Sequence, residues 1–248
     1  ALSQPPITFS ESSPAAEVDK DHDTICSGET PAPIVNTGLP SGGNGTYEYF
    51  WVQSVVSESG PWTTIPGTNN LLDYSPGALT QTTWFARVAK SPPCAQGITN
   101  SVVVVVNEQP EITSVSKDTL CSGETFSYLP TSNLPDVTYS WTASSATVTG
   151  FSPSGSGSIS DILSLPPGST MSGNVIYTIT PVGPEPTLCA GDPFELTVTV
   201  NPIPEVTNAS LSQTICAGGT TTAVTLTSGV PGTTFTWTAS VPSGISMK

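Results

Sequence analysis

A seven-residue phrase with a central cysteine occurs three times at a fixed interval along the chain. Residues 24–30 read TICSGET, residues 119–125 read TLCSGET, and residues 214–220 read TICAGGT. The central cysteines are Cys26, Cys121 and Cys216, so each copy follows the previous one by 95 residues. A constant interval of this kind is typical of tandem repeats that fold into similar units.

The two remaining cysteines recur at the same interval. Cys94 follows Cys26 by 68 residues, and Cys189 follows Cys121 by 68 residues. We therefore predict two disulfides, each within one repeat: Cys26 with Cys94, and Cys121 with Cys189. The corresponding partner of Cys216 would fall beyond Lys248, so we interpret Cys216 as a cysteine left unpaired by truncation.

Aromatic and valine-rich segments recur in step with the cysteines. An aromatic residue stands two positions before a tryptophan at residues 49–51, 139–141 and 235–237, which predicts strands with both rings on one face. The segments SVVVVVN (101–107) and LTVTVN (196–201) predict a final strand in each of two repeats. We predict repeat 1 with an N-terminal linker at residues 1–109, repeat 2 at 110–203, and an incomplete repeat 3 at 204–248.

The composition favours an all-β protein and excludes several classes of partner. The chain has 22 glycines and 25 prolines, and no stretch has the 3.6-residue periodicity of a helix. A net charge of −14 repels nucleic acid and anionic lipid headgroups. The longest aliphatic run has five valines, too short to span a membrane, so we expect no membrane insertion. The N-terminus lacks a basic residue before an apolar stretch, so no signal peptide is expected.

Short strands, an early tryptophan and a valine-rich last strand in each repeat predict an immunoglobulin-like β-sandwich. The predicted fold class is all-β: tandem immunoglobulin-like sandwiches, each with one intradomain disulfide, arranged as an extended rod. The tryptophan follows the phrase cysteine by 25 residues in repeat 1 and by 20 in repeat 2, more than in antibody domains. We therefore expect each disulfide at one end of its sandwich, between the start of the second strand and the loop before the last strand. Paired cysteines also indicate an oxidising compartment.

Several of these segments resemble a known class of repeats. TICSGET, the Trp51 strand, IPGTNNLLDYSPGALTQTTWFARV (65–88) and VVVVVNEQP (102–110) look like the immunoglobulin-like repeats of very large Bacteroidota surface proteins. YSWTAS, VIYTITP, CAG and LTVTVNPIP in repeat 2 are similar to the PKD-like repeats of such proteins. The resemblance implies a secreted protein of the bacterial cell surface, exported by the type 9 secretion system and linked to gliding motility.

Asp19, Asp21 and Asp23 alternate in the segment EVDKDHD. On an extended backbone their three carboxylates would point to one side, which makes them a candidate Ca²⁺ site. The segment is not an EF-hand loop, because Thr24 and Thr30 occupy the positions that require Gly and Glu. A solvated acidic linker accounts for the same pattern, and Ca²⁺ is the one candidate cofactor.

Two threonines stand at matching places in the first two repeats. Thr24 in Asp23-Thr24-Ile25 and Thr119 in Asp118-Thr119-Leu120 resemble the O-glycosylation acceptor of Bacteroidota. The third copy has Gln213 in place of the aspartate. Repetition of a structural phrase would produce the same match.

Trp62 and Trp84 lie outside the repeated tryptophan position. Trp62, beside Gly60-Pro61, is the better candidate for an exposed platform that binds carbohydrate, and packing in a turn is the alternative role. Trp84 alternates with neighbours in TTWFARV and is expected in the core. No nucleophile elbow, phosphate loop or His/Cys metal spacing is present, so we predict no catalytic residue and no enzyme.

We therefore expect stalk repeats of a secreted bacterial adhesin, which hold another region away from the cell. The alternatives are a carbohydrate-binding module and an accessory region of a secreted hydrolase. Expected partners are neighbouring repeats of the same chain, with surface polysaccharide or the secretion machinery as further candidates. Nucleic acid is not an expected partner.

Overall fold

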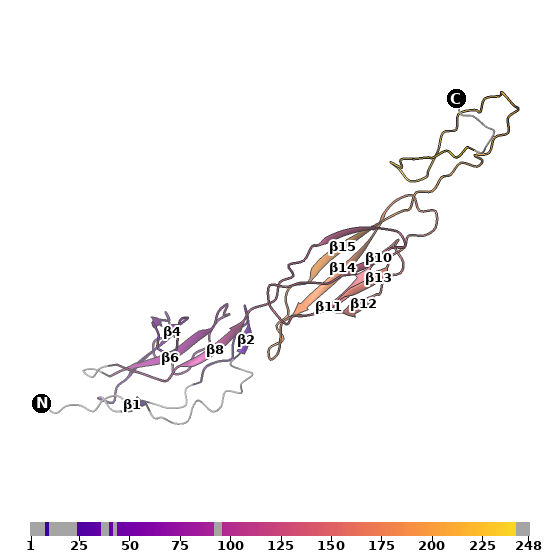
Figure 1. The fold of residues 1–248 in the computed structure, drawn as a ribbon. Coiled ribbons are helices and arrows are strands. Elements are labelled where there is room, and N and C mark those ends of the chain that lie inside the picture. The colour runs from indigo at the N-terminus through magenta and orange to yellow at the C-terminus, as the bar shows by residue number, and fades with distance from the viewer. Residues whose placement is uncertain (1–7, 10–23, 36–39, 42–43, 92–95, 242–248) are drawn as a thin grey trace. The chain divides into compact units, whose positions relative to one another are not determined.

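The computed structural model describes residues 8–9, 24–35, 40–41, 44–91 and 96–241. This part of the chain contains β-strands and no helix, so no helix in it is long and apolar enough to cross a membrane. The chain divides into two compact units (Figure 1). The first consists of Ala1–Glu111, Ser132–Thr138 and Pro181–Asp192, and the second of Ile112–Thr131, Tyr139–Thr180 and Pro193–Lys248. The predicted repeat boundaries at 109/110 and 203/204 stay a prediction from the sequence interval.

The main sheet of the first unit has the order β2-β8-β6-β4-β5, and β7 pairs with a further part of β6. β2 runs parallel to β8, and this pairing places Cys26 opposite Asn107. The remaining pairs in the sheet are antiparallel. The strands are β2 (Thr24–Cys26), β4 (Glu48–Ser54), β5 (Thr63–Thr64), β6 (Thr83–Lys90), β7 (Gly97–Ile98) and β8 (Val102–Asn107), with a separate pair of β1 (Thr8–Phe9) and β3 (Pro40–Ser41).

Opposite faces of β4 and β6 pack against two different clusters. Trp51 is 4% exposed and packs with Ile34, Phe85 and Val104, and its ring stacks on Tyr74 at a centroid distance of 5.7 Å. The other face buries Val52, Ala86 and Val88, against which Phe50 and Trp62 pack. Trp51 is therefore a core residue of the first unit.

In the described part of the first unit, the second layer of the sandwich is reduced to one isolated bridge between Ile34 and Tyr74. Pro31 and Pro33 lie just before Ile34. Proline cannot donate to a strand ladder, which explains why a full strand does not form here.

The second unit contains a two-sheet sandwich. One sheet has the order β12-β11-β14-β15-β9, and the other pairs β10 with β13. β9 runs parallel to β15 at the edge, as β2 does to β8 in the first unit. This is an immunoglobulin-like arrangement, so the all-β, immunoglobulin-like part of the predicted fold class is confirmed, and the extended rod stays a prediction. The strands are β9 (Lys117–Cys121), β10 (Thr125–Tyr128), β11 (Thr138–Ser144), β12 (Ser154–Ser156), β13 (Ile159–Ile162), β14 (Gly173–Val182) and β15 (Phe194–Asn201).

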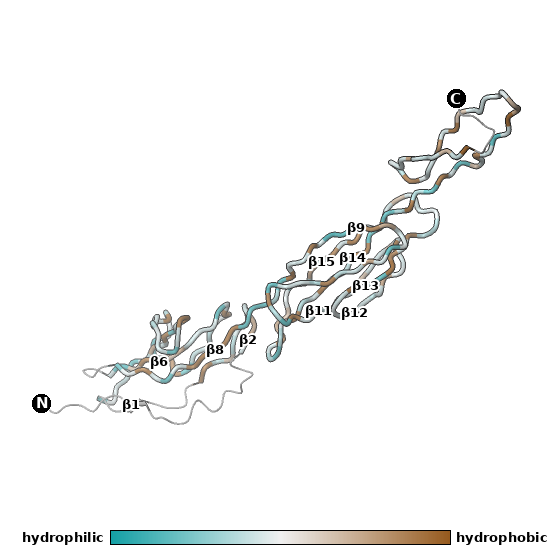
Figure 2. The backbone as a smooth tube through the Cα atoms, in the orientation of Figure 1, coloured by the Kyte–Doolittle hydropathy of each residue, from teal (hydrophilic) through white to brown (hydrophobic). Residues whose placement is uncertain are grey.

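Strict alternation on β14 and β15 builds the core of this sandwich. Every second residue from Val175 to Ile179, and from Leu196 to Val200, is fully buried, and hydrophobic positions recur along both strands (Figure 2). Trp141 on β11 packs edge-on against Tyr177 at 5.8 Å. Gly155 on β12 lies opposite Trp141, and a Cβ there would come within 2.4 Å of the indole ring, so this position requires glycine.

A carboxylate is buried in the same core. Asp161 on β13 is 6% exposed and accepts hydrogen bonds from the Tyr177 hydroxyl at 2.7 Å and from the Ser152 hydroxyl at 2.8 Å. Burial, followed by the interaction with Asp161, raises the pKa of Tyr177 above its ordinary range. The phenol therefore stays protonated and satisfies the carboxylate.

The described residues after β15, 202–241, contain no strand. Trp237 in this segment is 77% exposed, whereas the corresponding Trp51 and Trp141 are 4% and 7% exposed. Within residues 202–241 the repeated tryptophan therefore does not reach a core.

We predict that Tyr177→Phe destabilises the second unit by about 1–3 kcal/mol, because the buried Asp161 carboxylate loses a donor. The folded-state pKa of Tyr177 lies above its unfolded value of about 10, so its contribution is present below that pH and is lost as the pH rises above it. Urea unfolding between about pH 7 and 11 should show that the wild type loses stability at alkaline pH. Tyr177→Phe should lose less stability over the same pH range. Tyr128→Phe is the control, because it leaves the Tyr177–Asp161 pair intact. An equal alkaline loss in Tyr177→Phe and wild type would contradict this.

Candidate functional site at the disulfide

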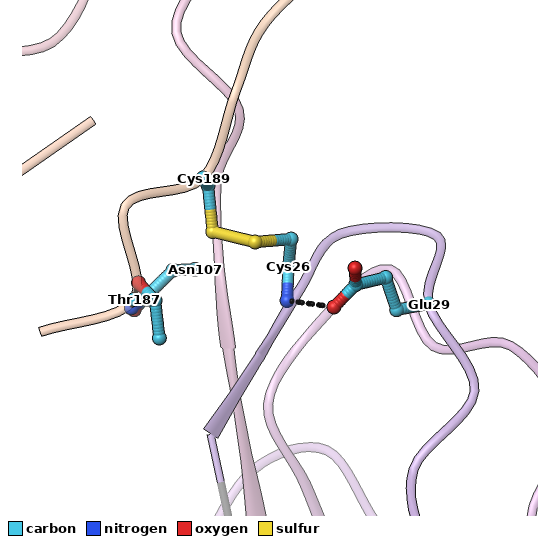
Figure 3. Close-up of a disulfide and its surroundings, with 5 residues drawn as sticks. All are labelled: Cys26, Glu29, Asn107, Thr187 and Cys189. Carbon is cyan, nitrogen blue, oxygen red and sulfur yellow. Dashed lines mark hydrogen bonds between the residues drawn. A yellow bond between two sulfur atoms is a disulfide. The ribbon is translucent and has the colours of Figure 1, made fainter. Parts of the chain in front are cut away.

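The phrase around Cys26 forms a closed turn at the end of β2. The Cys26 N–H donates to the Glu29 carboxylate at 2.9 Å, and the Glu29 N–H donates to the Cys26 carbonyl at 3.0 Å (Figure 3). The Ser27 N–H donates to the Asn107 carbonyl at 2.9 Å, which ties the turn to the end of β8. Gly28 has a φ of 87°, which favours glycine.

The same frame recurs around Cys121. The Cys121 N–H donates to the Glu124 carboxylate at 2.8 Å, and the Glu124 N–H donates to the Cys121 carbonyl at 3.1 Å. The Ser122 N–H donates to the Asn201 carbonyl at 2.8 Å, and Gly123 has a φ of 88°. The sequence Cys-Ser-Gly-Glu thus encodes a turn that clamps the end of the first strand to the end of the last strand.

The third copy retains only part of this frame. The Gly219 N–H donates to the Cys216 carbonyl at 2.9 Å, and Gly218 has a φ of 79°. Gly219 replaces the glutamate, so the carboxylate cap is absent from this copy.

The sulfur of Cys26 is bonded to that of Cys189, with a Cα–Cα distance of 5.6 Å and a sequence separation of 163 residues (Figure 3). Both predicted pairings, Cys26–Cys94 and Cys121–Cys189, are therefore wrong. Cys121 and Cys216 are exposed free thiols, and Cys94 lies outside the described residues. The bond joins the phrase of repeat 1 to a loop of repeat 2, and both cysteines belong to the first compact unit.

The parallel pairing of β9 with β15 explains why Cys121 does not bond Cys189. Cys121 lies opposite Asn201 at the carboxyl end of β15, whereas Cys189 precedes Phe194 at the amino end of this strand. A strand of that length separates its two ends by about 23 Å. Disulfides require Cα–Cα distances below about 7 Å.

Backbone contacts hold the loop that carries Cys189. The Gly183 N–H donates to the Cys189 carbonyl at 2.8 Å, and the Gly191 N–H donates to the Pro181 carbonyl at 2.9 Å. Pro181 and Pro110 are fully buried. A Cβ on Gly191 would lie 1.9 Å from the Pro110 carbonyl oxygen, so only glycine allows this approach. The cysteine is 2% exposed and is therefore fixed in place.

A side-chain contact and an open hollow accompany the bond. The Asn107 amide donates to the Thr187 hydroxyl at 2.6 Å. The hollow is lined by two carboxyl side chains, Glu108 and Glu185, and by no cationic side chain. This charge disfavours an anionic ligand. Its lining residues are Val106, Asn107, Glu108, Leu134, Pro135, Gly183, Pro184, Glu185, Pro186, Thr187 and Cys189. The Cys26–Cys189 bond is the covalent link at this site.

The other predicted site residues lie apart from the disulfide or outside the described chain. Asp19, Asp21 and Asp23 are outside it, and the described residues hold no group of three or more His, Cys, Asp or Glu side chains that could bind a metal ion. Thr24 is half-buried in β2, and Thr119 is exposed in β9. The glycosylation and Ca²⁺ hypotheses stay predictions.

Trp62 is half-buried and packs against the cluster formed by Val52, Ala86 and Val88. Trp84 is also half-buried rather than a full core residue. Carbohydrate binding by Trp62 stays a prediction.

Sequence reasoning missed a buried cation in the first unit. Arg87 on β6 is 1% exposed, its guanidinium lies 4.9 Å from the Tyr49 ring centroid, and it donates to the Leu72 carbonyl at 3.4 Å. Burial lowers the pKa of Arg87, and the charges of Tyr49 and Asp73 oppose that shift. Alternation that puts Trp84 in the core puts Arg87 on the opposite face of the strand, so the pattern did not indicate that Arg87 is buried.

Two family models match parts of the chain. Residues 118–204 match a PKD-like domain, and residues 15–108 match a domain of unknown function (DUF8696). No curated protein matches.

Solved immunoglobulin structures are similar to this chain at low identity. A DIP-gamma IG1+IG2 structure is 14% identical with a TM-score of 0.38, over 72% of this chain and 92% of that one. The titin domains I67-I69 are 10% identical with a TM-score of 0.38, over 81% and 66% of the two chains. Sidekick-1 immunoglobulin domains 1-4 are 11% identical with a TM-score of 0.32, over 73% and 46%.

We predict that the double substitution Cys26→Ser with Cys189→Ser lowers the unfolding free energy by about 2–5 kcal/mol, because the bond restricts the unfolded chain. Urea unfolding measures the change, and a reducing agent should bring the wild type to the same value. Cys121→Ser is the matched control, since this exposed free thiol should change stability by less than about 0.5 kcal/mol. An unfolding midpoint unaffected by both the double substitution and reduction would contradict the bond.

Proposed function

We propose that this chain forms stalk repeats of a secreted surface protein and that the Cys26–Cys189 bond carries tension along the stalk. The observation that supports this is the position of the bond in the sequence. Residues 27–188 lie between the two cysteines, so every strand from β3 to β14 is inside the loop that the bond closes.

The loop determines the path of a pulling force. Tension applied to the two ends of the chain passes from Cys26 directly to Cys189 through a covalent bond. The hydrogen-bonded strands inside the loop are then bypassed. Outside it, β15 is held on one side by β14 and on the other by β9. A stalk under shear needs this protection, because strand pairing yields at much lower force than a covalent bond.

Composition and compartment agree with this role. Disulfides persist in oxidising compartments outside the cytosol, which supports a secreted or surface location. The net charge of −14 keeps copies of the chain apart and soluble. The described residues supply a covalent bond and a packed two-sheet sandwich.

We further propose that the chain belongs to a bacterial cell-surface adhesin that is linked to gliding motility and exported by the type 9 secretion system. The resemblance of TICSGET, YSWTAS and LTVTVNPIP to Bacteroidota repeats supports it, together with the PKD-like match over residues 118–204. Labelling of intact cells of the native host with a membrane-impermeant reagent tests the location.

Single-molecule pulling from the two ends tests the mechanical role. We expect the oxidised chain to unfold without releasing residues 27–188. Reduction should add about 550 Å of contour length, from the sequence separation of 163 at about 3.4 Å per residue. The Cys26→Ser chain should release that length in the absence of reductant, and Cys121→Ser should behave as wild type. Equal contour lengths for oxidised and reduced wild type would overturn the proposal.

A further inference from the structure

Cys121 occupies the same backbone frame as the bonded Cys26 but is a free, exposed thiol. In both copies the cysteine N–H donates to a glutamate three residues on, and the next N–H donates to the asparagine that ends the last strand. The turn around Cys121 therefore has the same backbone hydrogen bonds as the turn in which Cys26 forms a disulfide. The described residues hold no disulfide partner for Cys121.

The surroundings of the two turns also correspond. The hollow beside Cys26 is lined in part by Asn107, Glu108 and Leu134. In the second unit, a hollow beside the Cys121 turn is lined in part by Ser122, Pro202, Glu205, Ser228 and Val230. The N–H of Leu134 donates to Ser132 Oγ at 3.3 Å, and that of Val230 donates to Ser228 Oγ at 3.3 Å. Equivalent loops therefore border both hollows.

The segment that follows β15 reproduces the hairpin that begins repeat 2. The Thr113 N–H donates to the Thr131 carbonyl at 2.8 Å, and the two hydroxyls are 3.0 Å apart. Thr207 and Thr227 show the same two contacts at 2.8 and 3.0 Å. The first residues of repeat 3 therefore repeat the local hydrogen bonds that open repeat 2.

We propose that Cys121 forms a disulfide with a cysteine in the following repeat, in the loop equivalent to residues 183–192. The partner lies 163 residues further along the chain, as Cys189 does from Cys26. The covalent link between consecutive repeats then recurs every 95 residues. This inference deepens the proposed stalk function and rests on it only for the oxidising compartment.

Formation of this bond requires an external oxidant, which is a small-molecule or protein disulfide. The Cys121 thiolate attacks one sulfur of that disulfide and expels a thiol, which gives a mixed disulfide. The thiolate of the loop cysteine then attacks the Cys121 sulfur and expels the second thiol. Two protein thiols are oxidised, and one external disulfide is reduced to two thiols.

The test is disulfide mapping of the complete polypeptide secreted by the native host. Free thiols are blocked, the protein is digested without reduction, and linked peptides are identified by mass spectrometry. We expect the Cys121 peptide to be linked to a downstream loop cysteine, in addition to the Cys26–Cys189 link. Free Cys121, a link from Cys121 to Cys189 or Cys216, or the absence of such a downstream cysteine would overturn the inference.

A second measurement distinguishes a following repeat from a second copy as the source of the partner. The 248-residue chain is oxidised with glutathione disulfide and run on a non-reducing gel. We expect a monomer in which Cys121 is blocked only by glutathione. A disulfide dimer that disappears in Cys121→Ser, but not in the control Cys216→Ser, would place the partner on a second copy and overturn the inference. The contour length released when the 248-residue chain is pulled depends only on the Cys26–Cys189 bond. The pulling experiment therefore tests the stalk function independently of the proposed Cys121 disulfide.

Discussion

The parallel pairing of the first strand with the last strand is the constraint on which the covalent architecture depends. In both units this pairing places the phrase cysteine at the carboxyl end of the last strand, opposite Asn107 or Asn201. The loop before the last strand begins at the other end of the same strand. Cys121 therefore cannot reach the loop of its own repeat, and Cys26 bonds the loop of the next repeat along the sequence.

Much of the fold could be predicted from local patterns. The phrase marks a turn because Gly28 and Gly123 need positive φ and the glutamates cap the cysteine N–H groups. Trp51, Trp141 and the alternating segment 196–201 reach the core as predicted, whereas Trp237 of the third copy is exposed. Cys189 lies in the loop before the last strand, as predicted, whereas Cys26 and Cys121 end β2 and β9 instead of starting the second strand of a repeat.

The pairing of the cysteines could not be predicted from the interval. In a periodic chain, a partner in the same repeat and a partner in the next repeat fit the spacing equally well, and only the long-range pairing of β9 with β15 decides between them. The buried Arg87 and Asp161 were missed for a related reason. Charged residues are expected at the surface, and their partners Tyr49 and Tyr177 come from other strands.

The most direct test of this account is non-reducing peptide mapping of the 248-residue chain after its free thiols have been blocked. The account predicts one linked pair of peptides containing Cys26 and Cys189, with Cys121 recovered in its blocked form. A peptide that links Cys26 to Cys94, or Cys121 to Cys189, would contradict it.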